Sequence, residues 1–228
     1  MKIEIWSDYA CPFCYIGEKR LEKALAEVGS DNIDIEFKSF ELDPTASNEV
    51  VSDTVDRFAI KYGMSKEDAA HRIEQISMMG RREGIDFKYS STRYTNTFDS
   101  LRLTKLAQER GHNEIITKLF DAYFTKNLEL SNHGVLKKIA VECGLDENEV
   151  DELLKGDKYA ADVRNDEREA VMLGIHGVPY FVIGGKYGLS GAQPVEVLKQ
   201  AINEALTDEA ETEFNGMTCG ANGCHFEG

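Results

Sequence analysis

Hydrophobic and polar positions alternate at the start of the chain and then change to a helical period. Residues 2–7 place isoleucines between polar neighbours, which predicts a β-strand with one buried face. Pro12 sets the backbone angle of a first helical turn, and apolar residues recur at helical spacing from there to Gly29. Alternation returns in residues 33–38. We therefore expect a strand, a helix and a second strand parallel to the first.

The middle and the end of the chain differ in pattern. Over residues 51–173 one helical pattern follows another, separated by glycines. Strand signals return in the apolar run 178–183, and the glycine pair 184–185 predicts a hairpin turn into a second strand over residues 186–189. A final amphipathic helix is predicted from Pro194 to about Leu206.

These patterns predict an α/β protein with one discontinuous domain. Neither strand-containing end has enough strands to close a core, so we expect both ends to pair into one sheet. The expected domain comprises residues 1–48 and 175–207, with a helical insertion over residues 49–174 and a tail over residues 208–228. A chain of 228 residues, 42% of them hydrophobic, is sufficient for such a core.

Charge and the first residues exclude several classes of partner. The chain carries 41 acidic and 26 basic residues, a net charge of -15, whereas nucleic acid and anionic lipid require clustered lysine and arginine. We therefore expect neither nucleic acid nor a membrane as a partner. The N-terminus lacks the apolar run of a signal peptide, and no stretch has the roughly 20 apolar residues of a membrane span. The expected location is the cytoplasm.

Two of the five cysteines lie where the first predicted strand gives way to a helix, in the sequence Cys11-Pro12-Phe13-Cys14. A thiolate at Cys11 would meet the unpaired N–H groups and the positive end of that helix, which stabilise a nucleophile. Cys14 lies one turn away, close enough to attack a mixed disulfide formed on Cys11. We interpret Cys11 as the attacking thiol and Cys14 as the resolving thiol. Half a zinc site and two merely buried cysteines are the alternatives. Zinc needs four ligands and no second pair follows in the same domain, so we expect no metal.

A proline opens the returning strand. Pro179 follows Val178 at a position where it cannot donate to the strand ladder. A cis peptide bond would resolve that conflict, and a trans proline at the strand start is the alternative.

Three segments together resemble a known family. They are SDYACPFCY at residues 7–15, GVPYFVI at 177–183 and CGANGC at 219–224. With the order of predicted elements, they make the chain similar to the DsbA-like branch of the thioredoxin superfamily, and more narrowly to FrnE-type proteins. The resemblance implies a thioredoxin-like fold with a large all-helical insertion, and a protein disulfide oxidoreductase or isomerase.

The same resemblance assigns a substrate groove. Pro179 would be cis and face Cys11, and the backbone of Val178 would hydrogen-bond an extended substrate by strand addition. The expected substrates are protein or peptide thiols and disulfides, with a glutathione- or thioredoxin-type thiol as the electron partner. No cofactor other than the redox-active disulfide is expected. The sequence leaves open whether two copies form a homodimer.

Two positions depart from the family pattern. Ile5 stands where thioredoxin and DsbA have a buried acid, so the usual proton acceptor is missing. Asp8 is either a substitute acceptor or an anchor for the loop and the helix start. Phe13 stands where DsbA has a histidine, so strongly oxidising behaviour is not expected.

The remaining cysteines raise separate questions. Cys219 and Cys224 are joined by Gly-Ala-Asn-Gly, which allows a tight turn that would bring the sulfurs within bonding range. We predict a second redox-active pair that exchanges with the first. Zinc binding with His225, or an idle tail, are the alternatives. Cys143 lies in a helical apolar pattern and is interpreted as buried and structural.

Two other functions compete with disulfide exchange. Kappa-class glutathione transferases and hydroxychromene-carboxylate isomerases share the expected architecture but carry serine where Cys11 stands. A peptide-binding chaperone module without catalysis would use only the apolar groove beside Pro179. The presence of both cysteines argues against the first alternative, with glutathione binding left open, and a disulfide-reduction assay separates the second.

Overall fold

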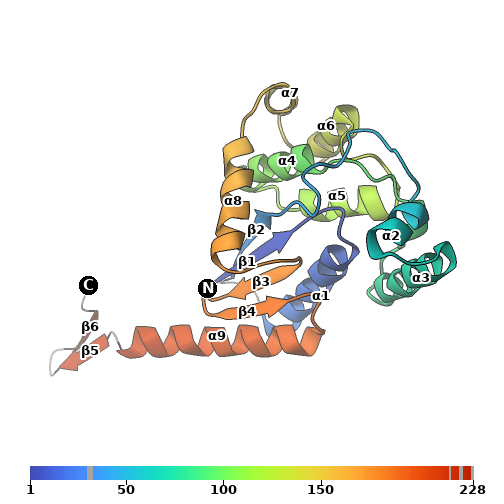
Figure 1. The fold of residues 1–228 in the computed structure, drawn as a ribbon. Coiled ribbons are helices and arrows are strands. Elements are labelled where there is room, and N and C mark those ends of the chain that lie inside the picture. Colours follow the sequence, from blue (N-terminus) through green and yellow to red (C-terminus); the bar gives the residue numbers. More distant parts are fainter. Residues whose placement is uncertain (30–32, 216, 221–222, 227–228) are drawn as a thin grey trace.

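The computed structural model describes residues 1–29, 33–215, 217–220 and 223–226, with side chains up to residue 210 (Figure 1). Its strands include β1 (Lys2–Ser7), β2 (Asp34–Ser39), β3 (Tyr180–Ile183) and β4 (Tyr187–Ser190). They form a four-stranded sheet in the order β2-β1-β3-β4. Strand β1 is parallel to β2 and antiparallel to β3, which is antiparallel to β4. Strands from the two ends of the chain therefore share one sheet, as the sequence predicts.

One face of this sheet packs against helices α1 (Pro12–Val28) and α9 (Val195–Asn215), and Figure 1 shows the two helices beside the strands. Helix α1 begins directly after Cys11, with proline in its first turn. It ends at Gly29, whose φ of 87° is a backbone angle that glycine adopts without strain. The buried apolar residues between sheet and helices are Ile3, Ile5, Leu21, Ala24, Leu25, Phe181, Ile183, Leu198, Ala201, Ile202 and Ala205.

The opposite face is covered by helix α8 (Ala160–Met172). Trp6 of β1 is fully buried there, and its indole Nε1 donates to the carbonyl oxygen of Asp166 at 3.0 Å. Ala170 and Ile175 complete this second, smaller apolar cluster. The sheet is therefore buried on both faces.

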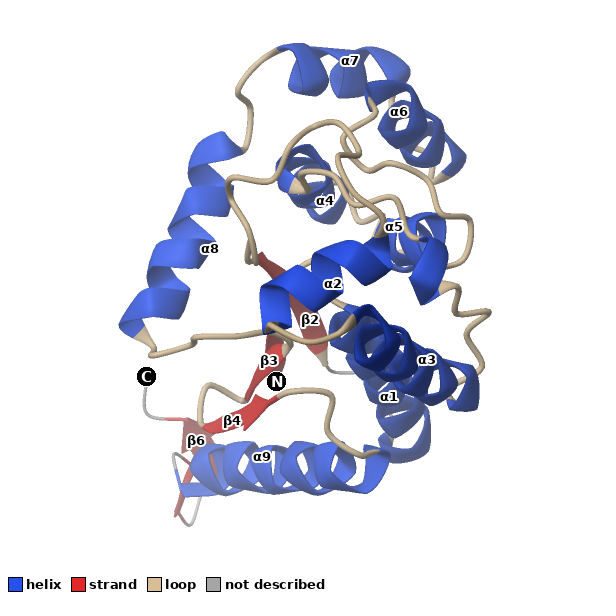
Figure 2. Ribbon diagram, turned by 45° about the vertical axis from the view of Figure 1, so that its right-hand side comes forward, coloured by secondary structure: helices blue, strands red, loops and turns tan. Residues whose placement is uncertain are grey.

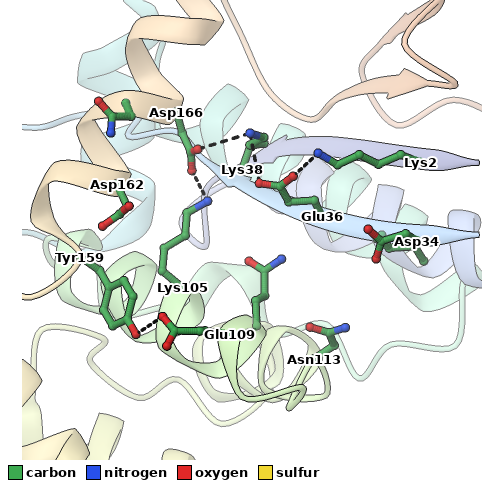
Figure 3. A pocket seen from close by; sticks show the side chains of 13 residues that line it. Lys2, Asp34, Glu36, Lys38, Lys105, Glu109, Asn113, Tyr159, Asp162 and Asp166 are labelled. Carbon is green, nitrogen blue, oxygen red and sulfur yellow. Dashed lines mark hydrogen bonds and ion pairs between the residues drawn. The ribbon is translucent and has the colours of Figure 1, made fainter.

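Helices α4 (Phe98–Glu109) and α8 also close the outer edge of β2, around a polar cavity of about 550 Å³ (Figure 3). The Asp166 carboxylate accepts from the N–H of Ser39 at 2.7 Å, and Lys105 donates to the carbonyl of Phe37 at 3.2 Å. Lys38 and Lys105 both pair with carboxylates, Asp166 among them. These opposite charges pair with one another. Together with the two helices they cover β2, an edge strand of the sheet, so that no further strand can pair with it.

In sequence, the remaining helices follow β2 and precede β3. They are α2 (Thr54–Tyr62), α3 (Lys66–Arg82), α5 (Ile115–Phe124), α6 (His133–Glu142) and α7 (Glu147–Lys155), with a short 3₁₀ turn at Tyr89–Ser91. Their core is continuous with the start of α1: the ring of Tyr15 stacks on Phe120 of α5 with centroids 5.1 Å apart. Helix α3 also packs against α1 (Figure 2). The helical segment therefore supports the cysteine-bearing helix directly.

The end of the chain differs from the sequence prediction. Helix α9 continues beyond Leu206 to Asn215, because the segment Thr207–Asn215 contains no glycine or proline to stop it. Strands β5 (Met217–Gly220) and β6 (Gly223–Phe226) then form an antiparallel hairpin that the sequence patterns did not predict. No helix in the described part of the chain is long and apolar enough to cross a membrane.

Candidate active site

Cys11 is the N-cap residue of α1 and lies where the sheet meets the helical segment. Its thiol donates to the carbonyl oxygen of Val178 at 3.4 Å, a contact that joins positions 167 residues apart. The N–H of Cys14 donates to the carbonyl of Cys11 at 3.1 Å, within the first turn. Both cysteines are free thiols, with only 4% of Cys11 and 2% of Cys14 exposed. The fold therefore brings Cys11, Cys14 and Val178 to one place.

The thiol of Cys14 is held in its neutral form. Burial raises the pKa of Cys14 well above its ordinary value, and the neighbouring Cys11 thiol raises it further. Hydrogen bonds with the Ser7 hydroxyl and the Asp8 backbone act in the opposite direction. Cys14 therefore has to lose a proton before it can attack a disulfide at neutral pH.

The carboxylate of Asp8 fixes the loop that precedes α1. One oxygen accepts from the N–H of Ala10 at 3.0 Å and from the Thr97 hydroxyl at 2.9 Å. The other accepts from the N–H of Leu42 at 2.7 Å. Burial raises the pKa of Asp8, while these three hydrogen bonds lower it. Asp8 is thus occupied as an anchor, the second of the two roles that its position allowed.

The Val178–Pro179 peptide bond is cis, and Pro179 is buried beside α1. The helix approaches the proline closely at Gly17, where an added Cβ would lie 3.2 Å from both Pro179 Cγ and Phe181 Cζ. A larger residue at this position would push the helix and the strand apart. Gly17 therefore sets the spacing between the cysteine-bearing helix and the proline.

A second buried acid, Glu18, lies one turn after Cys14 on α1. Both residues line a cavity of about 340 Å³, together with Ile5, Ser7 and Thr117. The Thr117 hydroxyl donates to Glu18 Oε1 at 2.5 Å, whereas Glu18 Oε2 is buried without a hydrogen-bond partner in the described structure. Burial raises the pKa of Glu18 from 4.5 to about 7. Ile5 of β1, which stands where related proteins have a buried acid, lines the same cavity. Glu18 of α1 therefore provides the acid that β1 lacks at this place.

The sequence motifs did not identify two residues at this site, Glu18 and Arg57. Glu18 carries a usable signal, since it follows Cys14 by four positions on a predicted helix and so shares its face. Arg57 of α2 lines a cavity with Cys11 and carries no such signal. Only the packing of the helical segment brings Arg57 there.

The other cysteines lie elsewhere. Cys143 ends helix α6, where it is buried among apolar side chains, and burial raises its pKa. Cys219 and Cys224 are direct backbone partners in the β5–β6 hairpin, but their sulfurs lie outside the described side chains. Figures 1 and 2 place this hairpin beyond the C-terminal end of α9, away from α1. Among the described side chains, no group of three His, Cys, Asp or Glu is arranged to hold a metal ion.

Comparison with known proteins gives consistent matches. The family model of the DSBA-like thioredoxin domain matches residues 2–203. A probable DsbA oxidoreductase from Streptomyces coelicolor is 38% identical, with a TM-score of 0.86 and full coverage of both chains. The uncharacterized protein YwbO of Bacillus subtilis is 28% identical over 207 residues, which cover 89% of this chain and 96% of YwbO.

A more distant structure shares the fold alone. It is a 2-hydroxychromene-2-carboxylate isomerase, 14% identical, with a TM-score of 0.69 and coverage of 93% of this chain and 99% of the isomerase. The family model, by contrast, spans nearly all of the sheet and helices described above. The chain therefore belongs to the DsbA-like thioredoxin-domain family of thiol–disulfide oxidoreductases.

Proposed function

We propose that the protein exchanges disulfides with protein substrates through Cys11 and Cys14. The observation that carries this proposal is the placement of the two free thiols within one turn at the start of α1, with Cys11 against the carbonyl of Val178. Val178 lines the cavity outside Cys11, and its backbone would align an extended substrate by hydrogen bonds, next to the cis bond to Pro179.

The reduction of a substrate disulfide proceeds in two exchanges. The Cys11 thiolate attacks one substrate sulfur, so the substrate S–S bond breaks and its other sulfur leaves as a thiolate that takes a proton. Cys14 then loses its proton and attacks Cys11, which releases the second substrate thiolate and forms the Cys11–Cys14 disulfide. Two electrons have passed to the substrate. A glutathione- or thioredoxin-type thiol would return them to the protein, and the same steps in reverse would oxidise a substrate dithiol.

In this cycle Glu18 accepts the proton of Cys14. Cys14 is neutral because of its burial, and Asp8 is already occupied by three hydrogen bonds. Glu18 has a free buried oxygen on the cavity that Cys14 also lines. That cavity, at about 340 Å³, has room for water, and Ser7 and Thr117 provide polar partners to hold a bridging molecule.

The finer family assignment and the tail belong to the same proposal. We assign the chain to the FrnE type, because CGANGC completes the three motifs and its two cysteines are paired across a hairpin. Directly opposed strand residues have Cα atoms about 4.5 to 5.5 Å apart, a separation that suits a disulfide. We propose that Cys219 and Cys224 form a second redox pair. We also propose that the protein acts in the cytoplasm, where close cysteine pairs are typically catalytic.

Reduction of a test protein disulfide in the presence of glutathione examines the function. We expect Cys11→Ser to abolish turnover and Cys14→Ser to accumulate long-lived mixed disulfides on Cys11. Cys143→Ser is the matched control, since it removes a buried thiol outside the site and is expected to retain turnover. Wild-type turnover in Cys11→Ser would overturn the proposal.

A further inference from the structure

A second cavity opens on the outer side of Cys11. It has a volume of about 200 Å³ and is lined by Cys11, Val178 and two cations of helix α2, Arg57 and Lys61. A larger groove of about 590 Å³ shares Arg57, Lys61 and Tyr94 with it. A path lined by two positive charges thus leads away from the attacking sulfur.

Arg57 is held in place, but no carboxylate among the described side chains pairs with it. Its guanidinium stacks on Tyr94, with Cζ 3.9 Å from the ring centroid. Its Nε and Nη2 atoms are buried and have no hydrogen-bond partner in the described structure. Arg102, which is more deeply buried than Arg57, by contrast donates to three backbone carbonyls and pairs with Asp99. Unpaired buried guanidinium donors are costly, which points to a missing acceptor.

The chemistry of that acceptor follows from the lining. A planar guanidinium with an ammonium one turn along the helix matches a carboxylate, which accepts two parallel hydrogen bonds. The aromatic rings of Tyr62 and Tyr89 line the same cavity and would contact the apolar part of the ligand. Asp43 and Glu49 lie on the larger groove and would repel a second anion placed farther from Cys11.

We propose that Arg57 and Lys61 bind a carboxylate carried by the substrate close to its reacting sulfur. The inference rests on the proposed disulfide exchange, and it makes the preferred substrates acidic thiols and disulfides. The carboxylate can come from a small acidic thiol such as glutathione or from an acidic residue beside the cysteine of a polypeptide. In a chain of net charge -15, this local positive site also gives anionic substrates a defined place to dock.

The test compares kcat/KM for matched substrates. One pair is two peptide disulfides that differ only in Glu or Gln beside the cysteine. The other pair is oxidised glutathione and the same compound with its carboxylates esterified. We expect the wild-type protein to prefer the acidic member of at least one pair by about 10- to 100-fold, and to lose preference as salt is raised. Preference in the peptide pair identifies a polypeptide source, and preference in the glutathione pair identifies a small thiol.

Variants assign the preference to the site. Arg57→Met should bring the acidic-to-neutral ratio close to one, and Lys61→Met should lower it, whereas Arg72→Met removes an exposed arginine of α3 and should leave the ratio unchanged. Lys61 is exposed, so its variant remains informative if Arg57→Met does not fold. Equal kcat/KM for both members of each pair in the wild-type protein would overturn the subsite. An unchanged ratio in both α2 variants would do the same. Turnover of the neutral substrates separates this result from a failure of disulfide exchange itself.

Discussion

Replacing Glu18 by glutamine separates proton transfer from structural support. Glutamine keeps the size of the side chain and an oxygen that can accept from Thr117. It removes the ionisable oxygen that faces the cavity shared with Cys14. The substitution therefore changes the acid–base chemistry of the cavity with little change in its shape.

The size of the effect on stability follows from the pKa of Glu18. Its carboxyl group titrates at about 7 in the folded protein and near 4.5 when unperturbed. Between these values the folded protein holds a proton that the unfolded chain has lost. The contribution of Glu18 to stability is thus fully present below pH 4.5 and is lost as the pH rises through about 7. At about 1.4 kcal/mol per unit, the 2.5-unit difference amounts to about 3 kcal/mol.

Glutamine does not titrate, so Glu18→Gln avoids this loss. Relative to the wild-type protein, the variant should gain about 3 kcal/mol in the free energy of unfolding between pH 4 and pH 8. Its resolving step should nevertheless be slower by about 100-fold at pH 8, the usual contribution of a general base. If Glu18 had a purely structural role, its replacement by glutamine would not both increase the stability and slow the resolving step.

Urea unfolding of the reduced protein at a series of pH values measures the first effect. The second is measured by the release of a substrate thiol from a mixed disulfide preformed on Cys11. In the wild-type protein this release should accelerate with pH, with a midpoint at about 7. Glu22→Gln is the control, because Glu22 borders the same cavity but its side chain is 50% exposed. Wild-type release rates in Glu18→Gln at pH 8, or parallel stability profiles, would refute the reasoning.

Two further predictions concern Asp8 and the tail. Asp8→Ala should lower the free energy of unfolding by about 3 kcal/mol, because it leaves three buried donors without their acceptor, and urea unfolding against the wild-type protein measures the loss. An unchanged midpoint would mean that water replaces the carboxylate. Oxidation of the Cys11–Cys14 pair should be followed by disulfide formation between Cys219 and Cys224, detected by alkylation and mass spectrometry. Tail thiols that stay reduced throughout would exclude exchange between the pairs.

Much of the fold is visible in the sequence because its signals are local. Period-two alternation in residues 2–7 and 33–38, helical spacing after Pro12, and the glycine pair at 184–185 depend only on neighbouring positions. The same holds for the cysteine pair, since a helix start fixes the distance from Cys11 to Cys14. The predicted end of the last helix at about Leu206 is wrong. No glycine or proline stands between Leu206 and Asn215, so α9 continues to Asn215.

The properties that make the site chemically active depend on residues distant in sequence. Burial raises the pKa of Glu18, while the hydrogen bond from Thr117 of α5, 99 positions away, lowers it. Arg57 of α2 reaches the cavity beside Cys11 through stacking on Tyr94, a residue of the loop that precedes α4. Burial and the pairing of charges are properties of the packed molecule, since both depend on which surfaces exclude water. The sequence therefore determined where the thiols are, and the tertiary structure decided which acid and which cation surround them.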